Sequence, residues 1–140
     1  MALIADSGGV YGLYDASDRN HPALEKAFNS ESGAVIVSAA ILGEIDYLLR
    51  ARLKTDAALH FLSDLAEGVF ALEAFTSADL VRSRKILDQY RDLDFGLCDA
   101  AVMATADRIG TTRILTVDER HFRVVRNIKG VPFYLLPADQ

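Results

Sequence analysis

Five short apolar runs recur along the chain, with helical patterns between them. The runs occupy residues 2–5, 34–37, 69–75, 114–117 and 131–136. The first of these is a continuous apolar run, which is typical of a strand that is buried in a parallel sheet, and the other four are further strand candidates. Strands that alternate with helices predict an α/β fold with a mainly parallel sheet, helices on both of its faces and right-handed crossovers. Pro132, near the start of the last run, predicts that this strand lies at an edge of the sheet.

The helical segments carry recognisable start and stop signals. We expect helices over residues 10–14, 23–28, 39–53, 55–66, 77–90 and 97–109. Ser38 and Thr76 are suitable N-caps, and Gly110 is suited to end the last helix. Ser7, Gly8 and Gly9 predict a flexible turn after the first strand. The helix over 77–90 is expected to bury an apolar side that includes Leu80.

The composition is that of an ordinary globular domain. The chain has 140 residues, of which 51% are hydrophobic and 25% charged. This length is sufficient to bury a core, and we expect one domain over residues 1–140. Cys98 is the single cysteine, which excludes an internal disulfide and is typical of a reducing compartment. Since no secretory signal or membrane span is recognisable, we expect a cytoplasmic protein.

The charge distribution is uneven. The net charge of −5 argues against a protein that binds nucleic acid with high affinity through charge alone. Residues 108–129 nevertheless hold six basic side chains, against only Asp118 and Glu119. This segment is able to meet a phosphate backbone or an acidic partner protein, and solvated surface charge is an equally good explanation.

Four acidic residues stand at or near the carboxyl ends of the predicted strands. Asp6 follows the first strand, Asp118 follows the fourth, Asp99 lies in the first turn of a helix, and Glu44 lies on the helix after the second strand. In an open α/β sheet ligands bind at this edge, near the point where the strand order reverses. Converging carboxylates repel one another, and a hard divalent ion such as Mg²⁺ or Mn²⁺ removes that penalty. The pattern therefore favours a metal site for phosphodiester hydrolysis by metal-activated water.

Each acid also has a plain structural explanation. An Asp after a strand often caps the next helix, and a Glu on a helix often faces solvent. Asp94, in the loop before residue 97, is suited to a turn or a cap. It is the joint pattern of acids at successive strand ends that favours a site.

At these residues the sequence resembles the PIN-domain family and, within it, the VapC-like toxins of type II toxin–antitoxin pairs. Four segments carry the resemblance in the family's order: IADSGGVYGLYDASDRNHPA, VSAAILGEIDYLL, LDFGLCDAAVMATADRIG and ILTVDERHF. They place the family's four acids at Asp6, Glu44, Asp99 and Asp118. Ser7-Gly8-Gly9 departs from the family, in which a Thr and a bulkier residue are common, although Ser7 still offers a hydroxyl.

The resemblance implies an α/β/α sandwich around a five-stranded parallel sheet. It also implies a Mg²⁺- or Mn²⁺-dependent endoribonuclease with RNA as substrate, a cognate antitoxin and a homodimer. Asp6 and Asp99 would be the primary metal ligands, and Glu44 and Asp118 would complete the acidic pocket. Asp94 matches more loosely and is kept as a supporting residue.

Other residues near the motifs have open roles. Thr116 either orients Asp118, contacts a metal-bound water or simply packs in its strand. For His121 a general-base role is conceivable, but hydrogen bonding in a turn or exposure to solvent is favoured over it. Cys98 is expected to be a small buried apolar residue. A catalytic nucleophile at this position would need a nearby general base, and the sequence indicates none.

Two other functions are compatible with parts of the pattern. The first is a PIN-like binding or regulatory module without catalysis, which the presence of all four acids disfavours. The second is a receiver-like signalling domain, which needs a Lys beyond the last strands. Lys129 is poorly placed for that role.

Overall fold

A five-stranded sheet in the order β3-β2-β1-β4-β5, with every pair of neighbours parallel, forms the centre of the computed structural model, which describes residues 1–140. This confirms the predicted parallel sheet and the edge position of the last strand. Four of the strands are shorter than the expected runs, and β2 has the expected length but begins one residue later. The strands are β1 (Leu3–Ala5), β2 (Val35–Ser38), β3 (Ala71–Glu73), β4 (Arg113–Leu115) and β5 (Tyr134–Leu136).

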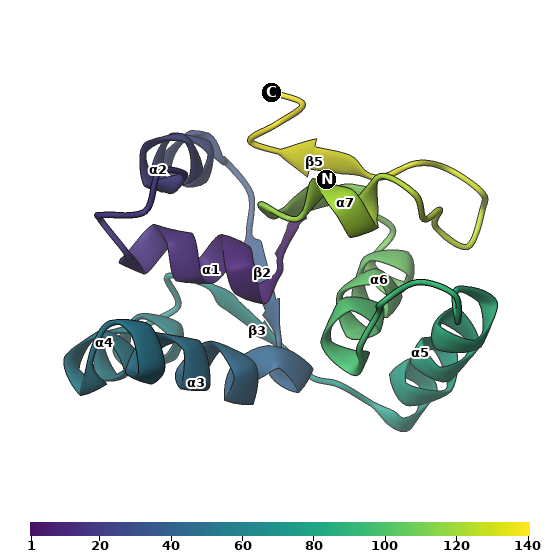
Figure 1. The fold of residues 1–140 in the computed structure, drawn as a ribbon, viewed down its shortest axis with the longest axis horizontal. Coiled ribbons are helices and arrows are strands. Elements are labelled where there is room, and N and C mark those ends of the chain that lie inside the picture. The colour runs from purple at the N-terminus through teal and green to yellow at the C-terminus, as the bar shows by residue number, and fades with distance from the viewer.

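Helices cover both faces of this sheet. Figure 1 shows α1 to α4 gathered on one side and α5 and α6 on the other, which is the expected α/β/α sandwich. None of the helices has both the length and the apolar character needed to cross a membrane. The helical elements are α1 (Ser7–Tyr14), α2 (His21–Ser30), the 3₁₀ turn η1 (Ala39–Ile41), α3 (Leu42–Arg52), α4 (Thr55–Ala66), α5 (Ser77–Gln89), α6 (Leu97–Ile109) and α7 (Glu119–Phe122).

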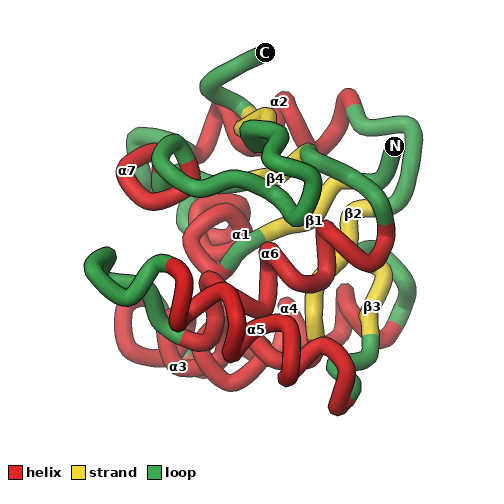
Figure 2. The backbone as a smooth tube through the Cα atoms, turned by 90° about the vertical axis from the view of Figure 1, so that its right-hand side faces the viewer, coloured by secondary structure: helices red, strands yellow, loops and turns green.

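The helix α6 is buried along most of its length. Every residue from Ala100 to Ala106 is buried, and most of their side chains are small. Small side chains let α6 lie close against β1 and β2, while α5 packs on its outer side, as Figure 2 shows from that direction. β1 and β2 are consequently buried on both faces, which explains their uninterrupted apolar sequence.

Several local predictions were wrong. Ser7, Gly8 and Gly9 are not a flexible turn, because α1 begins directly at Ser7. The helix expected over 39–53 is divided, since Ser38 caps the 3₁₀ turn η1 and α3 begins only at Leu42. Leu80 is 51% exposed instead of buried. The four-residue helix α7 was not expected at all.

The chain reverses its direction of travel across the sheet between β1 and β4. From β1 it adds β2 and then β3 on one side, and it returns to add β4 and β5 on the other side. In parallel α/β sheets this switch point is where ligands bind. Asp6 follows β1 and Asp118 lies just beyond β4, so both carboxylates emerge at the carboxyl edge of this point.

Candidate acidic active site

Asp6 connects the end of β1 to the start of α1. Its carboxylate accepts a hydrogen bond of 2.7 Å from the backbone N–H of Gly9 and thus caps the helix, and it accepts a second bond of 2.5 Å from the hydroxyl of Thr116. The side chain is only 7% exposed. Asp6 can therefore both cap α1 and belong to a site, because Oδ1 accepts the bond from Gly9 and Oδ2 accepts the bond from Thr116.

Gly9 allows this arrangement through close packing against β4. A Cβ atom at Gly9 would lie 2.3 Å from the carbonyl oxygen of Leu115, which is far inside van der Waals contact. The same carbonyl accepts a hydrogen bond of 3.1 Å from the backbone N–H of Asp6. The sequence pattern predicted a flexible turn at Gly8-Gly9, whereas Gly9 is needed because a backbone atom occupies the space beside it.

Thr116 joins two of the acids. Its hydroxyl donates to Asp6 and accepts a hydrogen bond of 2.9 Å from the backbone N–H of Asp118. Thr116 is 1% exposed, and its orientation is fixed by both bonds. Among the roles left open for Thr116, a contact with Asp118 is present through the Asp118 backbone N–H, and the bond to the Asp6 carboxylate was not predicted.

Asp118 caps α7 and is held by His121. Its two oxygens accept from the His121 backbone N–H at 3.0 Å and lie 2.8 Å from the His121 ring Nδ1. This confirms the expectation that His121 is hydrogen bonded in a turn. The contact was not predicted in detail, because α7 is too short to give a periodic sequence pattern.

Asp99 and Glu44 approach the same region from two helices. Asp99 lies in the first turn of α6 and accepts a hydrogen bond of 3.2 Å from the backbone N–H of Gly96. Glu44 lies in the first turn of α3 and is exposed. Cys98 is partly buried, and this burial together with the neighbouring Glu44 carboxylate raises the pKa of its thiol to about 12. A raised thiol pKa disfavours the thiolate, which is the nucleophilic form of cysteine.

All four acids line one cavity of about 160 Å³ at the carboxyl edge of the sheet. Its lining residues come from α1, α3, α6 and the segment after β4, and they are Asp6, Ser7, Gly8, Glu44, Cys98, Asp99, Val102 and Asp118. No three acidic, histidine or cysteine side chains converge closely enough to hold one ion as they stand. Mutual repulsion of carboxylates favours such separation.

Burial and neighbouring carboxylates raise the pKa of two of the acids, Asp6 and Asp99. Burial raises the pKa of Asp6 to about 7, and repulsion from Asp118 and Asp99 acts in the same direction. The hydrogen bonds from Thr116 and Gly9 lower this pKa but do not offset the effect of burial. Burial also raises the pKa of Asp99. A buried carboxylate of this kind needs a proton or a cation. Because the cavity's charged donors are all oxygen atoms, the residues fit a hard divalent ion such as Mg²⁺ or Mn²⁺.

Asp94 does not take part in this cavity. It is exposed in the loop before α6 and is not among the lining residues. Phe95, the next residue along the chain, is partly buried, and its ring lies 5.1 Å from that of His121. The loop thus contacts the site region through Phe95, an aromatic residue for which the sequence pattern predicted no role.

The basic segment 108–129 is largely neutralised within the chain. Arg123 pairs with Glu119 and Asp139, Arg113 pairs with Glu31, and Arg108 pairs with Glu73 and Asp79. Arg126 donates to backbone carbonyls. Arg120 and Lys129 make no ion pair, so the segment presents less free positive charge than its sequence suggested.

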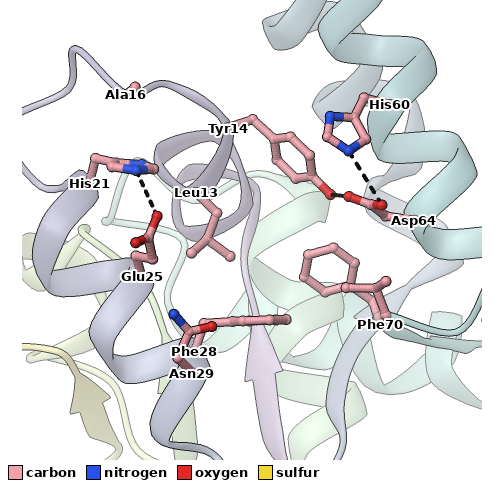
Figure 3. Close-up of a pocket in the computed structure, with 11 residues that line it drawn as sticks. Leu13, Tyr14, Ala16, His21, Glu25, Phe28, Asn29, His60, Asp64 and Phe70 are labelled. Carbon is pink, nitrogen blue, oxygen red and sulfur yellow. Dashed lines mark hydrogen bonds and ion pairs between the residues drawn. The ribbon is translucent and has the colours of Figure 1, made fainter.

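A second and larger cavity lies at the other end of α1, between α1, α2 and α4. It has a volume of about 490 Å³ and an apolar floor that includes Phe28 and Phe70. Figure 3 shows the Tyr14 hydroxyl directed at Asp64, a hydrogen bond of 2.5 Å, with His60 on the other side of the same carboxylate. Burial and this bond raise the pKa of Tyr14.

Comparison with known proteins identifies relatives that share this architecture. The family model "PIN domain" matches residues 5–127. The protein named Ribonuclease VapC26 of Mycobacterium tuberculosis is 35% identical over 135 residues, which are 96% of this chain and 100% of that one.

Solved structures show the same fold. Mycobacterium tuberculosis VapC20, described as a toxin that cleaves the sarcin–ricin loop, superposes with a TM-score of 0.79 at 21% identity, over 84% of this chain and 91% of that one. A DNA-bound VapBC from Salmonella typhimurium gives a TM-score of 0.71 at 14% identity, over 96% and 98%. With a family model over most of its length and a relative aligned end to end, the chain belongs to the PIN-domain family, and its likeness to VapC proteins confirms the resemblance carried by its four acidic motifs.

Proposed function

We propose that this protein is a Mg²⁺- or Mn²⁺-dependent endoribonuclease and the toxin of a toxin–antitoxin pair. The observation that carries the proposal is the set of four carboxylates, from four separate elements, around one cavity at the switch point of the sheet. The relative named Ribonuclease VapC26 supports the reaction class, and the toxin title of VapC20 supports the biological role.

In this proposal Asp6 and Asp99 are the primary metal ligands, and Glu44 and Asp118 complete the pocket. A bound ion neutralises charge that develops on the phosphate and lowers the pKa of the attacking water. A cation beside Asp6 would stabilise its ionised form, because the buried carboxylate is costly to ionise without one. Thr116 holds Asp6, and Ser7 places a hydroxyl at the cavity wall.

We propose a cognate antitoxin, RNA and a second copy of the chain as partners. The DNA-bound VapBC assembly of similar fold supports the antitoxin. The larger cavity offers such a partner an apolar floor, with Glu25 and Asp64 among its lining residues, a combination suited to an amphipathic helix that carries a basic residue. The same acidic residues repel a phosphate backbone, so we do not assign RNA binding to this surface.

Substitution of the acids tests the proposal. Asp6→Asn and Asp99→Asn are expected to abolish RNA cleavage and growth inhibition, with circular dichroism spectra like that of the wild type. Asp94→Asn is the matched control, because it makes the same change in an exposed loop outside the cavity. EDTA is expected to stop cleavage and Mn²⁺ to restore it.

The contrary results are equally specific. Full cleavage by either acid variant would contradict the site, and cleavage in EDTA would contradict the metal. A purified protein that binds a partner but cleaves no RNA with either ion would favour the alternative, a binding module without catalysis.

A further inference from the structure

The carboxylate of Asp118 is held at both oxygens by one residue. Its Oδ1 accepts from the backbone N–H of His121 at 3.0 Å, and its Oδ2 lies 2.8 Å from the ring Nδ1 of the same residue. A third bond, from the Asp118 backbone to Thr116, fixes the main chain. Both the position of the carboxylate and its rotation about the side-chain bonds are thereby determined.

His121 is itself held by an aromatic cluster. Its ring centroid lies 5.1 Å from that of Phe95, with 44° between the ring planes, and its side chain is only 14% exposed. Phe95 in turn packs against Tyr90 at 6.2 Å and Phe122 at 6.4 Å. These rings come from the end of α5, the loop before α6 and α7, so the cluster connects three separate segments to one imidazole.

The position of His121 is suited to orienting the Asp118 carboxylate and not to contacting the substrate. His121 does not line the acidic cavity, and its Nδ1 faces the Asp118 carboxylate. A ring nitrogen that donates to a ligating carboxylate fixes its orientation and strengthens its binding of a cation. The role of the loop before α6 then lies in the ring of Phe95 and not in the charge of Asp94.

We propose that His121 and Phe95 are positioning residues for Asp118, which set the affinity of the acidic cavity for its metal ion. This inference rests on the proposed function, because it takes Asp118 as one of the metal ligands. It adds two residues that do not touch the cavity and assigns each a separate contact: His121 orients the carboxylate, and Phe95 orients the imidazole.

Three variants separate the hydrogen bond from the ring contact. His121→Ala removes both, whereas His121→Asn retains a side-chain N–H donor at the same number of bonds from the backbone as Nδ1. Phe95→Leu keeps an apolar side chain but removes the ring. Mn²⁺ binding is measured by calorimetry without RNA, and steady-state RNA cleavage is measured beside it.

We expect His121→Ala to weaken Mn²⁺ binding by about 10- to 100-fold and to lower kcat with little change in KM for RNA. His121→Asn should recover most of the affinity, and Phe95→Leu should lie between the wild type and His121→Ala. Arg84→Ala is the control and should bind Mn²⁺ and cleave RNA like the wild type, since Arg84 lies at an exposed position of α5 and lines neither the acidic cavity nor the larger one.

Wild-type affinity and kcat in His121→Ala would overturn the inference, and so would an Asn variant as impaired as the Ala variant. Thermal unfolding of each variant excludes a general loss of structure; should His121→Ala fail to fold, the comparison of His121→Asn with Phe95→Leu still decides. A wild-type protein that neither binds Mn²⁺ nor cleaves RNA would overturn the proposed function and this inference together. Failure of the positioning role alone leaves the wild type and Asp6→Asn behaving as proposed.

Discussion

The hydroxyl of Thr116 donates a hydrogen bond of 2.5 Å to the carboxylate of Asp6, joining the end of β4 to the end of β1 across the switch point of the sheet. The same hydroxyl accepts from the Asp118 backbone. One threonine thus sets the distance between two of the four acids. Asp6 is the more dependent of the two, because it is buried and has few other partners.

Thr116→Val is therefore expected to impair the site while leaving the strand packed. Val has the shape of Thr but donates no hydrogen bond, so the pKa of Asp6 should rise further and the cation should bind more weakly. We expect metal affinity and kcat to fall by about 10- to 100-fold, as measured by Mn²⁺ titration and RNA cleavage.

Thr116→Ser is the control, because it keeps the hydroxyl and removes only a methyl group. It should retain most of the activity at some cost in stability. Equal activity in the Val and Ser variants would show that the hydrogen bond to Asp6 does not contribute to catalysis.

Gly9→Ala is expected to damage both stability and activity. The added Cβ would meet the Leu115 carbonyl oxygen at 2.3 Å, and a backbone atom is unable to turn aside as a flexible side chain does. The start of α1 must shift, which disturbs the Gly9 N–H bond to Asp6. We expect a loss of roughly 1–3 kcal/mol in the free energy of unfolding, measured with urea, together with a lower kcat.

Gly43→Ala is the matched substitution. Gly43 lies on α3, and a Cβ there meets nothing within 4 Å. Since Ala favours a helix over Gly by up to about 1 kcal/mol, this variant should be as stable as the wild type or more stable. A stable, fully active Gly9→Ala variant would contradict the close approach to β4.

Asp6→Asn is expected to stabilise the metal-free protein at high pH. The folded-state pKa of Asp6 is about 7, against 3.8 for an unperturbed Asp. Between these values the folded state holds a proton that the unfolded state has lost, so the wild type loses stability as pH rises from about 4 to about 7. Asn has no proton to lose. The gain at pH 8 should be at most about 4 kcal/mol, since one pKa unit corresponds to about 1.4 kcal/mol.

This effect is measured by thermal unfolding in EDTA at several pH values. The advantage of the Asn variant should shrink as pH falls from 8 towards 4, and added Mn²⁺ should stabilise the wild type more than the variant. Asp94→Asn, at an exposed position, should show no such pH-dependent gain. An Asn variant that is less stable than the wild type at pH 8 would contradict the raised pKa.

The sequence alone predicted the features that depend on local signals. The bounds of α6 followed from its apolar pattern and from Gly110, which adopts the left-handed conformation that ends the helix, and the cap at Thr76 followed from the Asp three residues later. The parallel sheet followed from mainly apolar strand segments that alternate with helical patterns. All four acids of the cavity could be named because strand ends in such a sheet lie on one edge.

The features that the sequence did not predict depend on contacts between distant segments. The role of Gly9 depends on its close approach to β4, and the role of Phe95 depends on the contact of its ring with His121. Neither contact is visible in the sequence. Asp94 was singled out for its charge in an acidic loop, but only packing decides which residue of a loop faces inward. Leu80 was assigned to an apolar side by its spacing, and it lies outside the core because α5 packs against α6 through other residues.

A last prediction concerns charges that stabilise the fold without serving the site. Arg108 on α6 donates to Asp79 on α5 and to Glu73 on β3, each at 2.9 Å, and to the Ala74 carbonyl at 3.2 Å. The Asp79 side chain is 3% exposed, so removal of Arg108 leaves a buried carboxylate without its cation. The Arg108 side chain is 38% exposed, which reduces the effect below that of a fully buried pair.

We expect Arg108→Ala to lower the free energy of unfolding by roughly 1–3 kcal/mol, measured with urea, while Mn²⁺ affinity and kcat stay unchanged. Arg108→Lys should recover only part of the stability, because a single ammonium group is unable to reproduce three directed donors. Arg84→Ala, at an exposed position of α5 without an ion pair, is the control and should unfold like the wild type. A loss of activity at full stability in Arg108→Ala would show instead that this cluster of charges communicates with the acidic cavity.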